Sequence, residues 1–123
     1  MATLEYAAAV LHTPLIIVLG HQNCGAVKAS IHSIDHNKQF PGHIQTLASA
    51  LLPAVRAVEN MPDDRYDNAI KMNVIRNVDK LKKQPSILSR LVAAKKLLVV
   101  GGVYSLKTGR VDLTFPREFA IKR

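Results

Sequence analysis

The sequence predicts an α/β fold with a parallel β-sheet core, helical crossovers and a C-terminal hairpin. Two short apolar runs, residues 15–19 and 97–104, lack polar alternation, which is typical of strands buried on both faces of a parallel sheet. The sequence between them has helical periodicity, so a right-handed helical crossover should connect them. Residues 110–115 follow a turn and predict a third, edge-like strand that pairs back onto the second.

The length of the chain fits one domain. Its 123 residues are enough for a single domain over residues 1–123, and 48% of them are apolar, which supports a hydrophobic core. Two or three strands nevertheless make a thin sheet with unpaired edges. Because the unpaired backbone groups of an edge strand can pair with another chain, we expect a homodimer or a higher homo-oligomer.

Helical patterns fill the rest of the chain. Helices are expected over residues 2–12, from Cys24 and Gly25 onward, and over 43–58, 62–83 and 86–96. Three of these segments contain apolar residues at helical spacing, which should face the core. They are Leu4, Ala7, Ala8 and Leu11; Ile44, Leu47, Leu51, Val55 and Val58; and Ile70, Val74, Val78 and Leu81.

Three residues mark the expected helix boundaries. Thr3 is a candidate N-cap for the first helix. Pro53 is expected to kink or divide the helix over 43–58, because proline removes a backbone donor. Pro62 is expected to begin the next helix, with two aspartates in its first turn.

The positive charge is uneven along the chain. Residues 1–60 hold three basic and three acidic residues, so the whole formal excess of +8 falls in residues 61–123. The lysines are not interleaved with aromatic residues, as a single-strand binding groove requires, so we interpret them as solvated helix faces and expect no nucleic acid partner.

The chain should also have no membrane partner. No apolar run approaches the roughly 20 residues that cross a bilayer, and the N-terminus lacks a secretory signal pattern. We therefore expect a soluble, cytoplasmic protein.

The segment that carries chemistry follows the first predicted strand. His21 and Cys24, the one cysteine of the chain, lie just past its C-terminal end, where sites gather in open α/β sheets. A His-x-x-Cys spacing lets an imidazole and a thiolate converge on one ion, and zinc accepts this mixture. Cys24 also lies near a helix N-terminus, which favours the thiolate.

Spacing alone leaves other interpretations open. His21 and Cys24 could be ordinary packed residues, or a reactive thiol with His21 as its base in a hydrolase or transferase. His32 and His36 have the i, i+4 spacing of a helical metal pair, but they lie beside a polar run and are interpreted as surface histidines.

Several segments, taken in order, resemble the β-class carbonic anhydrases. The motif around His21 and Cys24 resembles the second signature of that family. The segments that follow, as far as the closing hairpin, resemble the family less specifically. The segments concerned are LEYA, GHQNCGAV, PGHIQTLASALLPAV, NVIRNVDKLKKQPSIL and LLVVGGVYSLKTGRVDL.

The resemblance implies a zinc enzyme that interconverts carbon dioxide and bicarbonate. The family holds Zn²⁺ through two cysteines and one histidine, and His21 and Cys24 match the histidine and the second cysteine. Gly25 matches the glycine that follows them in the motif. The resemblance thus implies Zn²⁺ as cofactor, with His21 and Cys24 as metal ligands.

One part of the family pattern has no counterpart in this sequence. The first motif, Cys-x-Asp-x-Arg, supplies the other cysteine ligand and an Asp–Arg pair, and nothing here matches it. The resemblance therefore implies an incomplete β-carbonic anhydrase-like fold, the C-terminal portion of the family domain, without assigned catalytic residues. The alternatives are a catalytically inactive binding or assembly module and a related small-molecule hydrolase.

Overall fold

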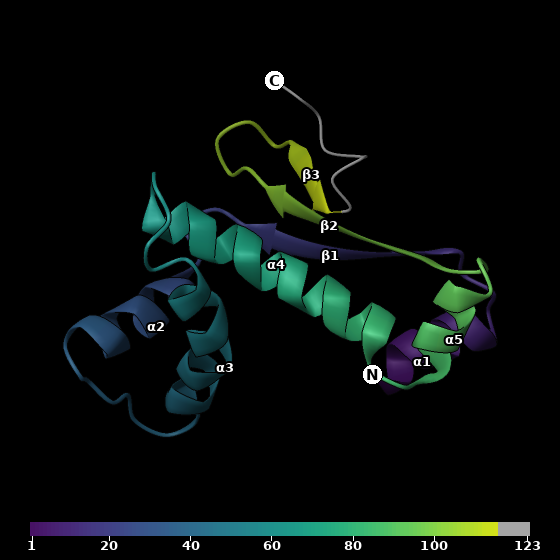
Figure 1. The fold of residues 1–123 in the computed structure, drawn as a ribbon, viewed down its shortest axis with the longest axis horizontal. Helices are drawn as coiled ribbons and strands as arrows, with labels where there is room; N and C mark the ends of the chain where they lie inside the picture. The colour runs from purple at the N-terminus through teal and green to yellow at the C-terminus, as the bar shows by residue number, and fades with distance from the viewer. Residues whose placement is uncertain (116–123) are drawn as a thin grey trace.

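The computed structural model describes residues 1–115 (Figure 1). Over these residues, helices and strands follow one another in the order α1 (Ala2–Ala9), β1 (Leu15–His21), α2 (Gly25–Asp35), α3 (His43–Ala57), α4 (Arg65–Lys83), α5 (Ile87–Ala93), β2 (Leu98–Tyr104) and β3 (Val111–Phe115).

The sheet has the order β1-β2-β3, with β2 in the centre. β1 pairs with β2 in parallel, from Leu15 opposite Leu98 to His21 opposite Tyr104. β3 pairs with β2 in the antiparallel direction, with an irregularity at Gly101 and Gly102. The predicted parallel pair, helical crossover and C-terminal hairpin are confirmed. Both parallel strands end at the same edge of the sheet, which is the edge that carries His21.

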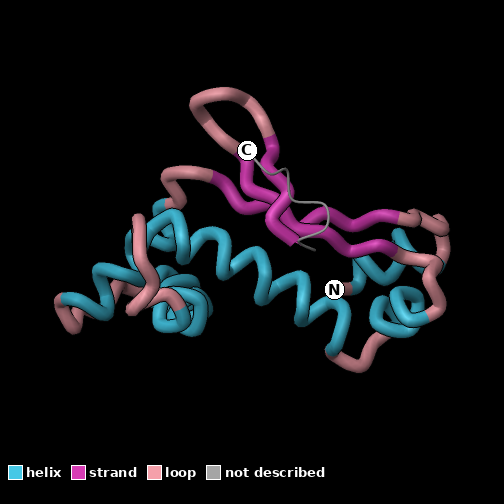
Figure 2. The backbone as a smooth tube through the Cα atoms, turned by 45° about the horizontal axis from the view of Figure 1, so that its top comes forward, coloured by secondary structure: helices cyan, strands magenta, loops and turns pink. Residues whose placement is uncertain are grey.

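The crossover helix α4 organises the core. It runs along one face of the sheet, with α2 and α3 at one end and α1 and α5 at the other (Figures 1 and 2). Val74 and Val78 pack with α1, α5 and the strands, whereas Ala69 and Ile70 pack with α2 and α3. All four side chains are buried, so α4 joins the two hydrophobic clusters.

The two-sided burial expected for the first strand is wrong for the described residues. Ile16 on β1 is buried toward α4, but its neighbours Leu15, Ile17 and Leu19 are 42%, 49% and 54% exposed. Side chains alternate between the faces of a strand, so these three share the face away from α4. His21 continues the same alternation and is also exposed. An apolar stripe on this face therefore ends at His21.

The first and fourth helices begin at other residues than predicted. α1 starts at Ala2, so Thr3 lies inside the helix and does not cap it. α4 starts at Arg65, because the Asp64 side chain accepts a hydrogen bond of 2.9 Å from the Asp67 N–H and thereby caps the helix. Pro62 consequently lies before the helix.

The inward stripes are only partly correct. Ile44 and Leu47 on α3 are more than half exposed, and Leu11 lies beyond the end of α1 and is 64% exposed. α3 turns Ala48 and Ala54 inward, because small side chains allow it to pack closely on its neighbours. Pro53 does not divide this helix. The stripe predicted for α4 is confirmed, apart from Leu81, which is half-buried.

Gly20 lies inside β1, so the strand extends beyond the predicted apolar run of residues 15–19. A Cβ atom at this position would lie 2.7 Å from Cγ2 of Val74. The glycine therefore lets the strand approach α4 closely just before His21. Within residues 1–115, we find no helix long and apolar enough to cross a bilayer.

Candidate metal centre

His21 and Cys24 flank a tight turn between a strand and a helix. His21 is the last residue of β1, and Cys24 is the N-cap residue of α2, with extended backbone angles. Between them, Asn23 adopts a left-handed backbone with φ of 54°, which asparagine tolerates better than most residues. The chain therefore reverses within two residues and keeps both candidate ligands at the carboxyl edge of the sheet.

The end of β2 fixes this turn. The Gln22 N–H donates a 3.0 Å hydrogen bond to the Tyr104 carbonyl oxygen. The Ser105 hydroxyl donates a second one, also 3.0 Å, to Oε1 of Gln22. Backbone and side chain of Gln22 are thus both held, so the position of the turn depends on the neighbouring strand.

The hydrogen bond of the His21 ring defines which nitrogen is available. Nδ1 lies 3.0 Å from the Gln22 carbonyl oxygen. A carbonyl oxygen can only accept, so Nδ1 carries the proton in this contact. In the neutral ring Nε2 then keeps its lone pair, which is the arrangement found for histidines that bind metals. The ring is exposed, so Nε2 is accessible.

Cys24 is a free, half-buried cysteine. Its carbonyl oxygen accepts a 2.5 Å hydrogen bond from the Tyr66 hydroxyl at the start of α4. Burial raises the pKa of Tyr66, and the charges of Cys24, Asp67 and Asp64 raise it further. The hydroxyl therefore stays protonated and donates. This bond ties α4 to the start of α2, 42 residues away in sequence.

The donor set fits zinc in kind but not in number. An imidazole and a thiolate are preferred zinc ligands, and a catalytic zinc usually has three protein ligands. No cluster of three or more His, Cys, Asp or Glu side chains that could hold an ion exists within residues 1–115. His12, His32, His36 and His43 therefore do not join the pair there, and all four are exposed, as predicted for His32 and His36.

Sequence reasoning missed the residues that hold the turn. Tyr66 is distant in sequence from Cys24, and nothing in its local pattern distinguishes it from another residue of the first turn of α4. Ser105 likewise lies in a turn that the sequence identifies only as a connection. Contacts of this kind form only when segments distant in sequence pack together in the folded chain.

Comparison with known proteins identifies the family. The family model described as carbonic anhydrase matches residues 1–111. Solved structures that resemble the fold are β-carbonic anhydrases. The chain belongs to the β-carbonic anhydrase family. The resemblance inferred from the sequence is therefore confirmed, and so is the fold class.

Individual β-carbonic anhydrases match most of this chain. A carbonic anhydrase of Mycolicibacterium smegmatis is 32% identical over 113 residues, covering 92% of this chain and 55% of that protein. The Coccomyxa β-carbonic anhydrase, solved with acetazolamide, has a TM-score of 0.73 at 31% identity, covering 92% and 52%. A tetrameric β-carbonic anhydrase of Sordaria macrospora has the same fold, with a TM-score of 0.77 at 22% identity, covering 93% and 58%.

The chain therefore spans about half the length of these β-carbonic anhydrases. That fraction agrees with the expectation of an incomplete family domain. It also agrees with the donor set, because the described residues supply a histidine and a cysteine and no third ligand.

Proposed function

We propose that this chain contributes His21 and Cys24 to a Zn²⁺ site and that the site serves the reversible hydration of carbon dioxide to bicarbonate. The observation that carries the proposal is the position of these residues at the carboxyl edge of two parallel strands. The family match over residues 1–111 supports a metal-binding role for residues at that position.

The two residues have separate roles in this proposal. His21 binds the metal through Nε2, while its Nδ1–H stays on the Gln22 carbonyl oxygen. Cys24 binds through its thiolate, and Tyr66 holds the backbone of Cys24 in place. A bound zinc ion lowers the pKa of water, which makes hydration of carbon dioxide possible near neutral pH.

Further donors must come from polypeptide outside residues 1–115 of this chain. β1 is an edge strand, so the backbone groups along its outer side are available to another strand. A strand added there would lie directly beside His21. We infer that this edge is where the remaining part of the site approaches.

A carbon dioxide hydration assay on the 123-residue chain, supplied with zinc, tests the enzyme proposal. Turnover that disappears in Cys24→Ser and persists in His43→Ala would support it. His43 is an exposed histidine on α3 and serves as the matched control. If the wild-type chain shows no turnover above the buffer rate although it binds zinc through Cys24, this chain alone is not a carbonic anhydrase.

A second function is a catalytically inactive binding or assembly module of the same family. The observation that favours it is the donor count, because two ligands from residues 1–115 do not by themselves hold a catalytic zinc. The same assay separates the two functions. Robust Cys24-dependent turnover would exclude the inactive module.

We also propose that a second copy of this chain covers the exposed face of the sheet. The apolar stripe of Leu15, Ile17 and Leu19 supports this, because such a surface is costly to leave in water. The Sordaria macrospora relatives with the same fold are tetrameric. A cytoplasmic location is part of the same proposal, and cell fractionation would test it.

A further inference from the structure

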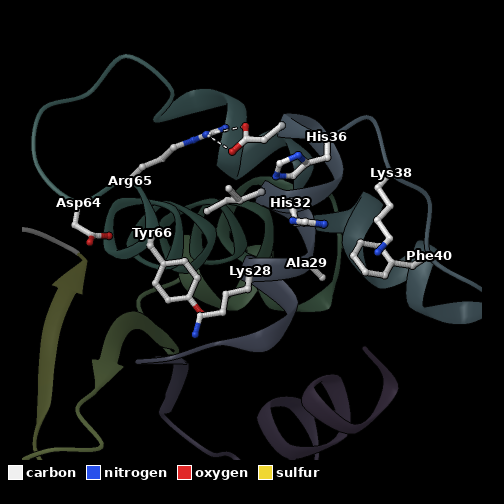
Figure 3. Close-up of a pocket in the computed structure, with 11 residues that line it drawn as sticks. Lys28, Ala29, His32, His36, Lys38, Phe40, Asp64, Arg65 and Tyr66 are labelled. Atoms are coloured by element: carbon white, nitrogen blue, oxygen red, sulfur yellow. Dashed lines mark hydrogen bonds and ion pairs between the residues drawn. The ribbon is translucent and has the colours of Figure 1, made fainter.

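A hollow of about 790 Å³ lies between the outer side of α2 and the start of α4 (Figure 3). Its lining includes neither His21 nor Cys24, but it adjoins the candidate metal centre through Tyr66, which also bonds the Cys24 carbonyl oxygen. Basic side chains predominate in it: Lys28, His32, His36, Lys38 and Arg65, against Asp35 and Asp64.

Both carboxylates in the lining are already engaged. Asp35 accepts two hydrogen bonds, of 2.9 and 3.1 Å, from Nη1 of Arg65. Asp64 caps α4 through the Asp67 N–H. The pair of Asp35 and Arg65 therefore adds no net charge, whereas the Asp64 carboxylate keeps its negative charge at the start of α4.

Lys28 and Lys38 add two positive charges to the lining, against the one remaining negative charge of Asp64. Neither Lys28 nor Lys38 makes an ion pair in the described part of the chain. Both are exposed, so their ammonium groups can reach an anion in the hollow. The lining thus keeps a formal excess of one positive charge, with its two lysines at separate points, and a cation bound at His32 and His36 would be repelled by them.

An aromatic ring lies beside each of the two lysines. Nζ of Lys28 lies 5.4 Å from the centre of the Tyr66 ring, and Nζ of Lys38 lies 5.8 Å from the centre of the Phe40 ring. The ring centroids of His32 and His36 are 4.3 Å apart between these two positions. Figure 3 shows both lysine side chains beside their rings. The walls therefore combine positive charge with π-faces.

We propose that this hollow binds a planar organic anion, whose aromatic ring packs on the side-chain rings and whose phosphate or carboxylate group pairs with one of the two lysines, Lys28 or Lys38. Charge alone would accept any anion, and rings alone would accept any aromatic molecule. The combination selects a molecule that carries both features, because each part gains contacts that the other cannot make. The proposal goes beyond carbon dioxide hydration and does not depend on it.

Titration of phenyl phosphate into the metal-free chain, followed by NMR, tests the proposal. We expect saturable binding with shifts confined to α2, residues 36–42 and the start of α4. Inorganic phosphate and phenol, which carry only one of the two features, should each bind at least about fivefold more weakly. Equal affinity for phenyl phosphate and inorganic phosphate would overturn the proposal, as would the absence of saturation at millimolar concentrations.

Variants locate the binding. The double variant Lys28→Gln and Lys38→Gln should weaken phenyl phosphate at least about fivefold, and Phe40→Leu should weaken it without changing the affinity for inorganic phosphate. Lys107→Gln, which removes an exposed lysine from the hairpin, is the matched control. Equal losses in the control and the double variant would contradict a site in this hollow. Cys24→Ser should leave binding unchanged, which separates this test from that of the metal centre.

Discussion

The hydroxyl of Tyr66 donates a 2.5 Å hydrogen bond to the carbonyl oxygen of Cys24. This contact joins the crossover helix α4 to the turn that carries both candidate zinc ligands. The Tyr66 ring is half-buried, and the Lys28 ammonium lies over it. The position of Cys24 therefore depends on a residue from a distant part of the sequence.

Replacing Tyr66 with phenylalanine removes only this hydrogen bond donor. We expect the free energy of unfolding to fall by about 1 kcal/mol, since the Cys24 carbonyl loses its partner. Urea unfolding followed by circular dichroism measures this. Tyr6→Phe is the control, because Tyr6 is 58% exposed on α1 and should tolerate the change. Equal stability of Tyr66→Phe and the wild type would mean that the contact does not hold the turn.

Gly20 tests how closely the strand must approach α4. Its substitution by alanine places a Cβ atom 2.7 Å from Val74, which is stiff and buried in the core. We expect a loss of about 1–3 kcal/mol in the free energy of unfolding. Gly25→Ala is the control, since its Cβ would meet no atom within 4 Å. Similar stabilities of these two variants would contradict the packing described for Gly20.

The exposed stripe on β1 predicts association in solution. Ile17→Asp introduces a charge into the centre of that stripe, and we expect it to shift the chain toward the monomer, because a buried unpaired carboxylate is unfavourable. Light scattering after size exclusion measures the mass. Leu47→Asp changes a similarly exposed residue on α3 and should leave the mass unchanged. A wild-type chain that is already monomeric and well folded would remove the proposed second copy.

The fold was largely predictable because its signals are local. The apolar runs that became β1 and β2 and the stripe of Ile70, Val74 and Val78 all depend on residues adjacent in sequence. The residue at which a helix begins is less predictable. Pro62 was predicted to begin α4, but the helix begins after Asp64, because the Asp64 side chain accepts a hydrogen bond from the Asp67 N–H.

The wrong expectations about burial have one common cause. A continuous apolar run predicts burial, but the sequence does not contain what buries it, and within residues 1–115 one face of β1 stays exposed. Ile44 and Leu47 are exposed on α3 as well. The candidate ligands were found from spacing and family resemblance, whereas Tyr66 and Ser105 act through contacts that only the folded chain creates.

The central claim is that His21 and Cys24 bind one metal ion together. Titration of the chain with Co²⁺, a spectroscopic substitute for zinc, tests it most directly, because a thiolate ligand gives a charge-transfer band in the near ultraviolet. We predict weak Co²⁺ binding, with a thiolate charge-transfer band that disappears in Cys24→Ser. His21→Ala should lower its affinity at least about tenfold, with no change in His43→Ala. A wild-type chain without a thiolate band, or a His21→Ala variant with unchanged affinity, would contradict the account.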